Sequence, residues 1–204
     1  MWALIEDGSI TKLINNPKGM TIDNIQYSRN IFFLWSKSER EAKGIYEVIQ
    51  NNAKKKEEEY YTNTNQTFTY DADAGTVTAT YGDATAKAHA DTLYTADDED
   101  NGLGTEGEVK VEGLKTRKIR TIKKQAASEL ARTEWYIVRK ADADTAIPSA
   151  ITNHRAAVRT KCAQMETAVT NASNTAAIKT LYTYTKQEDG SITRPLGELP
   201  TLEV

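Results

Sequence analysis

The chain has 204 residues, of which 39% are hydrophobic and 8% aromatic, and its formal net charge at pH 7 is -3. This balance gives the whole molecule no electrostatic attraction to nucleic acid or to an anionic membrane surface. No apolar run approaches the roughly 18 residues of a membrane span, and the opening residues lack the features of a signal peptide. Because the single cysteine, Cys162, excludes an internal disulfide, we expect synthesis in a reducing cytoplasm.

Residues 1–50 are expected to form a small β-rich module. The apolar segments Trp2–Ile5 and Ile10–Ile14 flank Asp7 and Gly8, a pair that is typical of a two-residue hairpin turn. The sequence therefore predicts a β-hairpin at the start of the chain.

One short helix is expected later in this module. Ser36 can cap a helix, acidic residues fall in the first turn of residues 38–44, and Gly44 can end it. This pattern predicts about two helical turns. The apolar run Ile31–Trp35 before the helix is expected to belong to short strands and turns, and Ile45–Ile49 after it is expected to be a strand.

Residues 51–112 are expected to contain a second hairpin and then a loop. The charged segment 52–59 is typical of a solvated helix or a linker and marks a boundary. Beyond it, Tyr60–Tyr70 and Thr76–Tyr81 are rich in threonine and aromatic residues that alternate with a period of two around a turn at 71–75. This alternation predicts the central β-hairpin.

The remainder of this segment is less regular. Residues 84–93 leave two alternatives open, a short alanine-rich helix or a loop, and the acidic, glycine-rich residues 97–107 predict a loop. A G-x-G-x-x-G sequence at 102–107 follows acidic residues that would repel a phosphate, so we do not expect a dinucleotide site. The same loop partly matches a calcium-binding loop, although a solvated acidic turn is the simpler interpretation; its ligands would be Asp97, Asn101 and Glu108.

Residues 113–185 are predicted to form an antiparallel module of three helices. Apolar residues at helical spacing predict the first helix over Leu114–Ala131. Trp135–Arg139 is expected to be a short extended or turn segment with two large aromatic side chains. Pro148 then begins a long second helix, and Ser173 can cap a short third helix.

Residues 186–204 are expected to form a hairpin and an extended C-terminal tail. The segment Glu188–Thr193 repeats Glu6–Thr11 residue for residue, which we interpret as convergent turn chemistry. The tail beyond it contains two prolines and no packing period, so it should be mobile in isolation. We therefore expect a partner to order the tail, with Leu199 and Leu202 in contact.

The sequence offers little for catalysis. His89 and His154 have no cysteine pair at zinc spacing, and motifs for a serine nucleophile, a zinc protease or a phosphate loop do not occur. Cys162 lies on the apolar face of the second helix and is expected to be a small core residue. The six cations between Lys115 and Lys124 are interpreted as a solvated face opposite the apolar stripe, or as a face toward an acidic partner such as the loop Asp97–Asp100, rather than as a nucleic-acid site. The absence of aromatic residues among them argues against binding of single strands. We expect a protein that is not an enzyme and has no cofactor.

Two parts of the chain resemble proteins of tailed bacteriophages. The segment Leu130–Lys140, the dipeptide Ile147-Pro148 and the segment His154–Arg159 are similar to phage tail assembly chaperones and tail-fibre-assembly proteins. Their pattern is a leucine followed by Thr/Ser-Asp-Trp, a loop with proline, and Tyr-Arg-x-x-Leu-Arg. This chain differs from the pattern at Glu134, His154 and Val158.

The first fifty residues carry the second resemblance. Trp2–Ile14 and Leu34–Tyr46 look like the N-terminal module of such phage proteins, including proteins of marine phages. The resemblance covers about half of the chain and implies a structural module rather than a catalytic site.

The sequence therefore predicts an α+β protein that serves as a structural component of a tailed-phage virion, tail- or fibre-associated. It would be made in the host cytoplasm, be present in multiple copies and contact other virion proteins, without a membrane or nucleic-acid partner. The alternatives are an assembly chaperone that leaves the particle and an accessory calcium- or glycan-binding module. Arg155 and Arg159, four apart on the second helix, could meet a neighbour's carboxylates, and Trp135 and Tyr136 would complete the contact.

Overall fold

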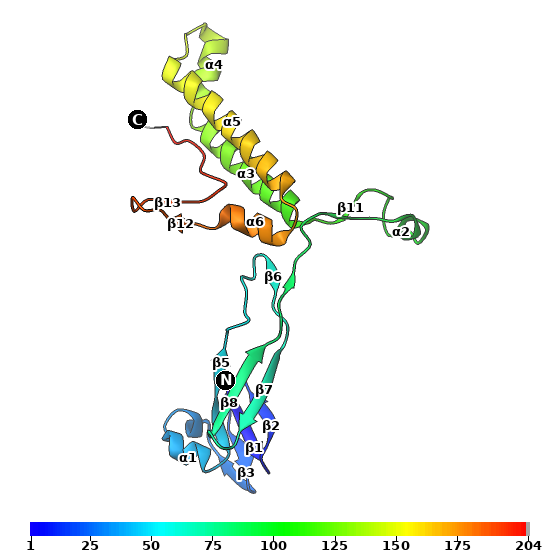
Figure 1. Ribbon diagram of the computed structural model, residues 1–204, viewed down its shortest axis with the longest axis vertical. Coiled ribbons are helices and arrows are strands. Elements are labelled where there is room, and N and C mark those ends of the chain that lie inside the picture. Colours follow the sequence, from blue (N-terminus) through cyan, green and yellow to red (C-terminus); the bar gives the residue numbers. More distant parts are fainter. Residues whose placement is uncertain (203–204) are drawn as a thin grey trace. The chain divides into compact units, whose positions relative to one another are not determined.

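The computed structural model describes residues 1–202 (Figure 1). The chain contains both helices and strands, which confirms the predicted α+β class. The chain divides into two compact units, residues 1–85 and a second unit that begins at Ala86. The division falls within the predicted central segment 51–112. In the described part of the chain, no helix combines the length and the apolar character needed to cross a membrane.

The first unit is built on a five-stranded sheet with the order β2-β1-β5-β8-β7. All neighbouring pairs are antiparallel except β5 and β8, which run parallel. Both predicted hairpins are confirmed, β1 with β2 and β7 with β8. The strands are β1 (Trp2–Glu6), β2 (Ser9–Ile14), β5 (Ile45–Asn51), β7 (Gln66–Asp71) and β8 (Thr76–Tyr81).

The turn of the first hairpin has the expected chemistry. Asp7 has φ 50° and Gly8 has φ 72°. Positive φ at both central residues defines the tight turn whose twist matches that of the two strands. The turn therefore sets the register in which Glu6 faces Ser9 and Ile5 faces Ile10, and an irregularity between Leu4 and Ile5 then shifts the pairing so that Ala3 faces Leu13.

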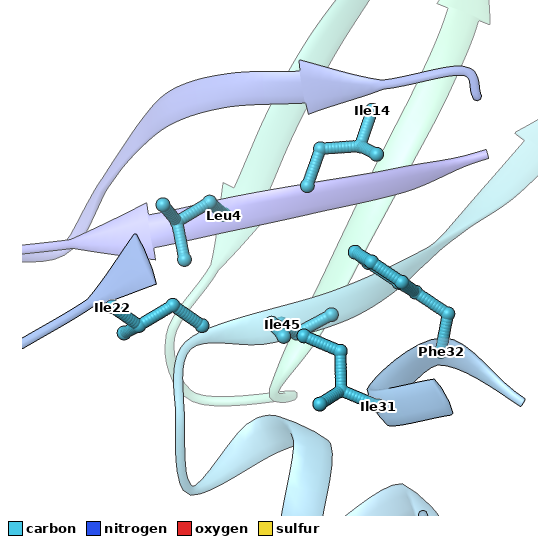
Figure 2. Packing of buried hydrophobic residues seen from close by; sticks show 6 residues of the cluster. All are labelled: Leu4, Ile14, Ile22, Ile31, Phe32 and Ile45. Atoms are coloured by element: carbon cyan, nitrogen blue, oxygen red, sulfur yellow. The ribbon is translucent and has the colours of Figure 1, made fainter. Parts of the chain in front are cut away.

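One face of the sheet carries a cluster of large aliphatic and aromatic side chains. Leu4 from β1 and Ile45 from β5 meet side chains from the connecting segments, as Figure 2 shows. These segments include the hairpin of β3 (Met20–Ile22) and β4 (Ile25–Tyr27). Burial of such side chains contributes roughly 1.5–3 kcal/mol each. The cluster consists of Leu4, Ile14, Ile22, Ile31, Phe32 and Ile45.

Of the strands and turns expected around the apolar run Ile31–Trp35, the structure has a turn. The first part of the run belongs to a 3-10 helix, η1 (Arg29–Phe32), which begins after Ser28. The Ser28 hydroxyl accepts a hydrogen bond from the Asn30 backbone N–H. This turn points Phe32 into the cluster, where its side chain is buried. Burial of Phe32 therefore outweighs the strand propensity of the run.

The opposite face of the sheet has a second, smaller core. Ala3 lies beside Leu4 on β1 and therefore points the other way, where it packs with Val48 and Val77. At the edge of this core, the Tyr46 and Tyr70 hydroxyls share a hydrogen bond, with 3.2 Å between the two oxygens. This hydrogen bond, together with burial, raises the pKa of Tyr46 to about 12. The sheet thus has apolar side chains packed on both faces.

The short helix α1 (Lys37–Glu41) confirms the cap predicted at Ser36. The Ser36 hydroxyl accepts from the Glu39 N–H at 3.3 Å, and the Glu39 carboxylate accepts from the Ser36 N–H at 2.7 Å. The Glu39 carboxylate also accepts from the Ser36 hydroxyl at 2.7 Å, and this bond, followed by the one from the Ser36 N–H, holds the pKa of Glu39 below its usual value. The helix is shorter than predicted, because the chain turns at Gly44 to enter β5.

Residues 84–93 are mostly loop and contain two very short strands, so the helical alternative for this segment is wrong. β9 (Thr85–Ala86) pairs with β6 (Tyr61–Thr62), and β10 (Thr92–Leu93) pairs with β11 (Val109–Val111). The expected loop at 97–107 begins instead with the short helix α2 (Ala96–Asp100). Its N-terminus is closed by reciprocal hydrogen bonds between Thr95 and Asp98.

The helices of the second unit are α3 (Leu114–Ala131), α4 (Glu134–Ala143), α5 (Ser149–Asn171) and α6 (Thr175–Tyr182). α3 has the predicted bounds. It packs against α5, which runs antiparallel to it (Figure 1). The third predicted helix, α6, is capped by Asn174 instead of Ser173, because the Asn174 side chain accepts from the Ala177 N–H. A short hairpin of β12 (Thr185–Lys186) and β13 (Ile192–Thr193) follows.

The segment Trp135–Arg139 is helical, so the prediction of a short extended or turn segment is wrong. Thr133 interrupts α3 with φ -117° and ψ 9°, and its carbonyl then accepts the Tyr136 N–H at 3.2 Å as a new helix begins. Aromatic and β-branched residues favour strands only weakly, and local hydrogen bonding decides the outcome here.

Gly44 and Gly8 provide a direct test of backbone packing in the first unit. Both have φ 72°, but a Cβ at Gly44 would lie 2.3 Å from the Ile5 carbonyl oxygen, whereas nothing lies within 4 Å of a Cβ at Gly8. We expect Gly8→Ala to lower the free energy of unfolding by about 1 kcal/mol and Gly44→Ala to lower it by at least about 2 kcal/mol more. Urea denaturation followed by tryptophan fluorescence measures both. Equal losses would contradict the close approach of Gly44 to β1.

Candidate functional site

The junction of α3, α4 and α5 is organised by one buried cation, Arg155. Only 5% of Arg155 is exposed. Its guanidinium donates 2.8 Å hydrogen bonds to the Leu130 carbonyl and to the Thr133 hydroxyl, and a 2.9 Å bond to the Glu134 carboxylate. A cation at the end of a helix also interacts favourably with the helix dipole. Arg155 therefore fixes the end of α3 and the start of α4.

Thr133 completes this junction from the other side. Its side chain is almost fully buried, and its hydroxyl donates to the Leu130 carbonyl at 3.0 Å while it accepts from Arg155. The last carbonyls of a helix have no partner within the helix, and these side chains satisfy one of them. Sequence reasoning missed Thr133, because a threonine after a helix gives no local indication of burial.

Arg155 is therefore not the partner-contact residue that the sequence predicted. Its guanidinium donates hydrogen bonds within its own chain, and only Arg159 of the predicted pair is exposed on α5. Residues four apart on a helix point in similar directions, but here the burial boundary of α5 falls between them. Reversing the charge of Arg155 would damage the fold itself rather than a contact with a neighbour.

The C-terminal tail also packs on its own chain, which corrects the expectation that a partner orders it. Leu196 is buried in the helical core with Met165 and Val169, and its N–H donates to the Leu181 carbonyl at 3.0 Å. Leu199 packs partly buried against the same cluster. Apolar burial outweighs the lack of regular structure in the tail.

The end of the described tail meets a polar cluster on α3. The Leu202 N–H lies 3.4 Å from the Glu129 carboxylate, within hydrogen-bond distance. The same carboxylate pairs with Arg132, and His154 Nε2 lies 3.4 Å from it. Leu202 is thus held within its own chain, as Leu199 is. The last two residues of the predicted tail, Glu203 and Val204, lie outside the described residues.

α4 presents an aromatic surface on which Trp135 and Val138 are exposed and Tyr136 and Arg139 are half-buried. No residue of α4 is buried; Trp135 is 52% exposed and Val138 is 61% exposed. The rings of Trp135 and Tyr136 have centroids 4.4 Å apart, and the Arg139 guanidinium lies 4.6 Å from the Trp135 ring. We name Trp135, Tyr136, Val138 and Arg139 the α4 surface. Grouped exposed apolar side chains of this kind mark interaction sites.

The sequence identified Trp135 and Tyr136 but missed the other half of this surface. A helical period would have placed Val138 three residues after Trp135 and Arg139 three residues after Tyr136. The extended structure expected for this segment concealed that spacing.

The sequence-predicted calcium ligands are not assembled as a metal site. Asp97 lies within α2, where the Asn101 side-chain amide donates to the Asp97 carbonyl at 2.6 Å. Neither Asp97 nor Glu108 belongs to a group of three or more His, Cys, Asp or Glu able to hold a metal ion within residues 1–202. The helical backbone of α2 replaces the open loop that calcium coordination requires.

Cys162 has the environment of a structural thiol. It packs against the core of the helical module, and its thiol donates to the Glu166 carboxylate at 3.2 Å. Burial, followed by this hydrogen bond, raises the pKa of the Cys162 thiol. A raised pKa reduces the thiolate fraction and thus the nucleophilicity of the group.

Comparisons with known proteins found no relative. The sequence matches no protein-family model, and neither curated proteins nor solved structures gave a match. The α4 surface and the Arg155 junction beneath it therefore have to be interpreted from their own geometry.

Arg155 and Arg159 form a matched pair for testing the junction. We expect Arg155→Met to lower the free energy of unfolding by about 2–3 kcal/mol, because it removes hydrogen bonds to Leu130 and Thr133 in a buried position. Arg159→Met should change it by less than about 0.5 kcal/mol, because Arg159 is exposed. Chemical denaturation followed by circular dichroism measures both changes. A similar loss for the two variants would show that Arg155 does not hold the junction.

Proposed function

We propose that the chain is a non-enzymatic structural component of a tailed-phage virion, associated with the tail or its fibres. It acts through protein–protein contacts. The observation that carries this proposal is the α4 surface, where Trp135 and Val138 are exposed on a helix whose start is fixed by a buried arginine.

The composition of the α4 surface suits a protein partner. Tryptophan, tyrosine and arginine are the residue types that contribute most to binding at protein interfaces. Here the Arg139 guanidinium stacks on Trp135, so both side chains are ordered before a partner arrives. Ordering before binding reduces the conformational entropy that association costs.

The resemblance to phage proteins supplies the biological setting. The segment that resembles tail assembly proteins, Leu130–Lys140, includes the first seven of the ten residues of α4 and all four residues of the α4 surface. The residues of the α4 surface lie within the segment that carries the resemblance. In this proposal the partner that contacts them is therefore another protein of the tail. An assembly chaperone that binds a fibre protein and then departs would use the same surface, and the experiment below separates the two roles.

Mass spectrometry of purified virions tests the proposal. We expect the chain in particles of the phage that encodes it, at a fixed copy number. If the chain co-purifies with a fibre protein from infected cells and is absent from particles, the structural role is wrong and the chaperone role replaces it.

A substitution on the α4 surface tests where the contact lies. We expect Trp135→Ala to lower the amount of chain per particle at least about tenfold, since loss of an interface tryptophan commonly weakens binding by more than that. Ile192→Ala is the matched control, because Ile192 is an exposed apolar residue of β13, away from α4. Circular dichroism checks that both variants are folded. Normal incorporation of Trp135→Ala would exclude the α4 surface as the contact.

A further inference from the structure

A second exposed surface lies on the segment that precedes α3. Residues 91–113, which we name the arm, consist of β10, α2 and β11. The arm is ordered by its own contacts: the Lys110 ammonium pairs with the Asp98 carboxylate at 2.7 Å, and the Leu103 N–H donates to the Asp98 carbonyl at 2.9 Å. Lys110 lowers the pKa of Asp98, so this pair stays charged near neutral pH.

The base of the arm is fixed to the start of α3. The Asp91 carboxylate accepts hydrogen bonds from the Gly113 N–H at 2.6 Å and from the Thr116 hydroxyl at 2.7 Å. These bonds, that from Thr116 first, lower the pKa of Asp91. A Cβ at Gly113 would lie 2.3 Å from the Ala90 backbone, so the two ends of the arm are in close contact. Figure 1 shows the arm leaving the start of α3 and running away from the helix.

The arm exposes apolar side chains that nothing in the described chain covers. Leu93 on β10 lies opposite Val109 on β11, and both are about half exposed. Leu103, in the turn after α2, is 60% exposed. A two-stranded ribbon without a covering layer is marginally stable in water. The arm therefore presents an unpartnered sheet face.

The arm is also strongly acidic. Residues 91–113 contain eight Asp and Glu residues and one cation, Lys110. Asp97 and Asp100 on α2 are exposed and have no ion-pair partner among residues 1–202. A partner for this face must therefore offer cations together with a surface on which apolar side chains can lie.

The solvent face of α3 in the same chain has these properties. Leu114, Ile122 and Ala126 mark the buried side of the helix. On the opposite side Arg117 and Lys124 are exposed, two helical turns apart. Arg120 lies between them and pairs with Glu112 at the base of the arm. The following turns carry the exposed small residues Ala127, Ser128 and Ala131, over which apolar side chains could pack closely.

The arm and the face cannot meet within one chain. Hydrogen bonds to Asp91 hold the base of the arm at the N-terminus of α3, and the arm extends away from that helix. The carboxylates on α2 therefore do not reach Arg117 or Lys124 of α3 in the same chain. In a second copy no such restriction applies. Two different surfaces of one chain that fit each other form a head-to-tail contact, which builds rings or filaments.

We propose that the arm of one copy docks on the solvent face of α3 in the next copy, with Asp97 and Asp100 facing Arg117 and Lys124. The exposed leucine and valine side chains of the arm then lie over the small residues of α3. This self-association does not depend on the virion role, and it can be measured on the purified chain whether or not that role is correct.

A charge exchange tests the contact. The arm variant carries Asp97→Lys and Asp100→Lys, and the face variant carries Arg117→Glu and Lys124→Glu. We expect each variant alone to self-associate at least about tenfold more weakly than the native chain, because like charges then face each other. An equimolar mixture of the two variants should associate about as strongly as the native chain. Sedimentation velocity over a range of concentrations gives the apparent Kd.

Two controls accompany this experiment. Lys12→Glu with Lys18→Glu reverses two exposed lysines of the first unit and should leave self-association unchanged. Circular dichroism verifies that every variant retains the native helix content. Salt should weaken association of the native chain, since exposed charges are screened over about 10 Å at 0.1 M ionic strength.

Three results would overturn the proposal. The first is a native chain that stays monomeric up to about 1 mM at low salt. A Kd of about 1 mM corresponds to a binding free energy of only about 4 kcal/mol. The second is self-association of either variant at native strength. The third is a mixture that associates no better than its components. Binding of duplex DNA to the native chain but not to the face variant would assign the α3 face to nucleic acid instead.

Discussion

The guanidinium of Arg155 is the contact on which the second unit depends. It joins the end of α3, the start of α4 and the first turns of α5 through bonds to Leu130, Thr133 and Glu134. Removing a charge from water is costly, and here the cost is offset by hydrogen bonds to three acceptors: a carbonyl, a hydroxyl and a carboxylate. The direction of α4, and with it the position of Trp135, follows from this arrangement.

The tail reinforces the same part of the molecule. Leu196 fills the core between α3 and α5, and Leu202 ends beside the Glu129 carboxylate near the α3 terminus. The tail, which has no regular structure, is thereby held against the helices. Burial of Leu196 fixes one end, and a hydrogen bond from the Leu202 N–H to the Glu129 carboxylate fixes the other. The α4 surface and the arm are among the surfaces of the second unit that neither the tail nor the other helices cover.

The two candidate surfaces differ in their physical character. The α4 surface combines aromatic rings with a stacked arginine, which suits a contact with a separate protein. The arm combines acidic and apolar side chains, and a basic face of matching character occurs on the same chain. A protein with one surface for its own copies and another for a different protein could connect a repeated layer to a neighbouring component, as the proposed virion role requires.

The elements with local signals could be predicted from the order of the amino acids alone. The hairpin at Asp7 and Gly8, the capped helix after Ser36 and the bounds of α3 each depend on residues within a few positions of one another. Only the tertiary structure decided the burial of Arg155, which bonds across 22 residues, and the anchoring of Leu202, which bonds across 73. It also decided that the strand-favouring segment after Thr133 is a helix. Such contacts join residues far apart in the chain, so no local pattern records them, and burial alone distinguishes Arg155 from Arg159.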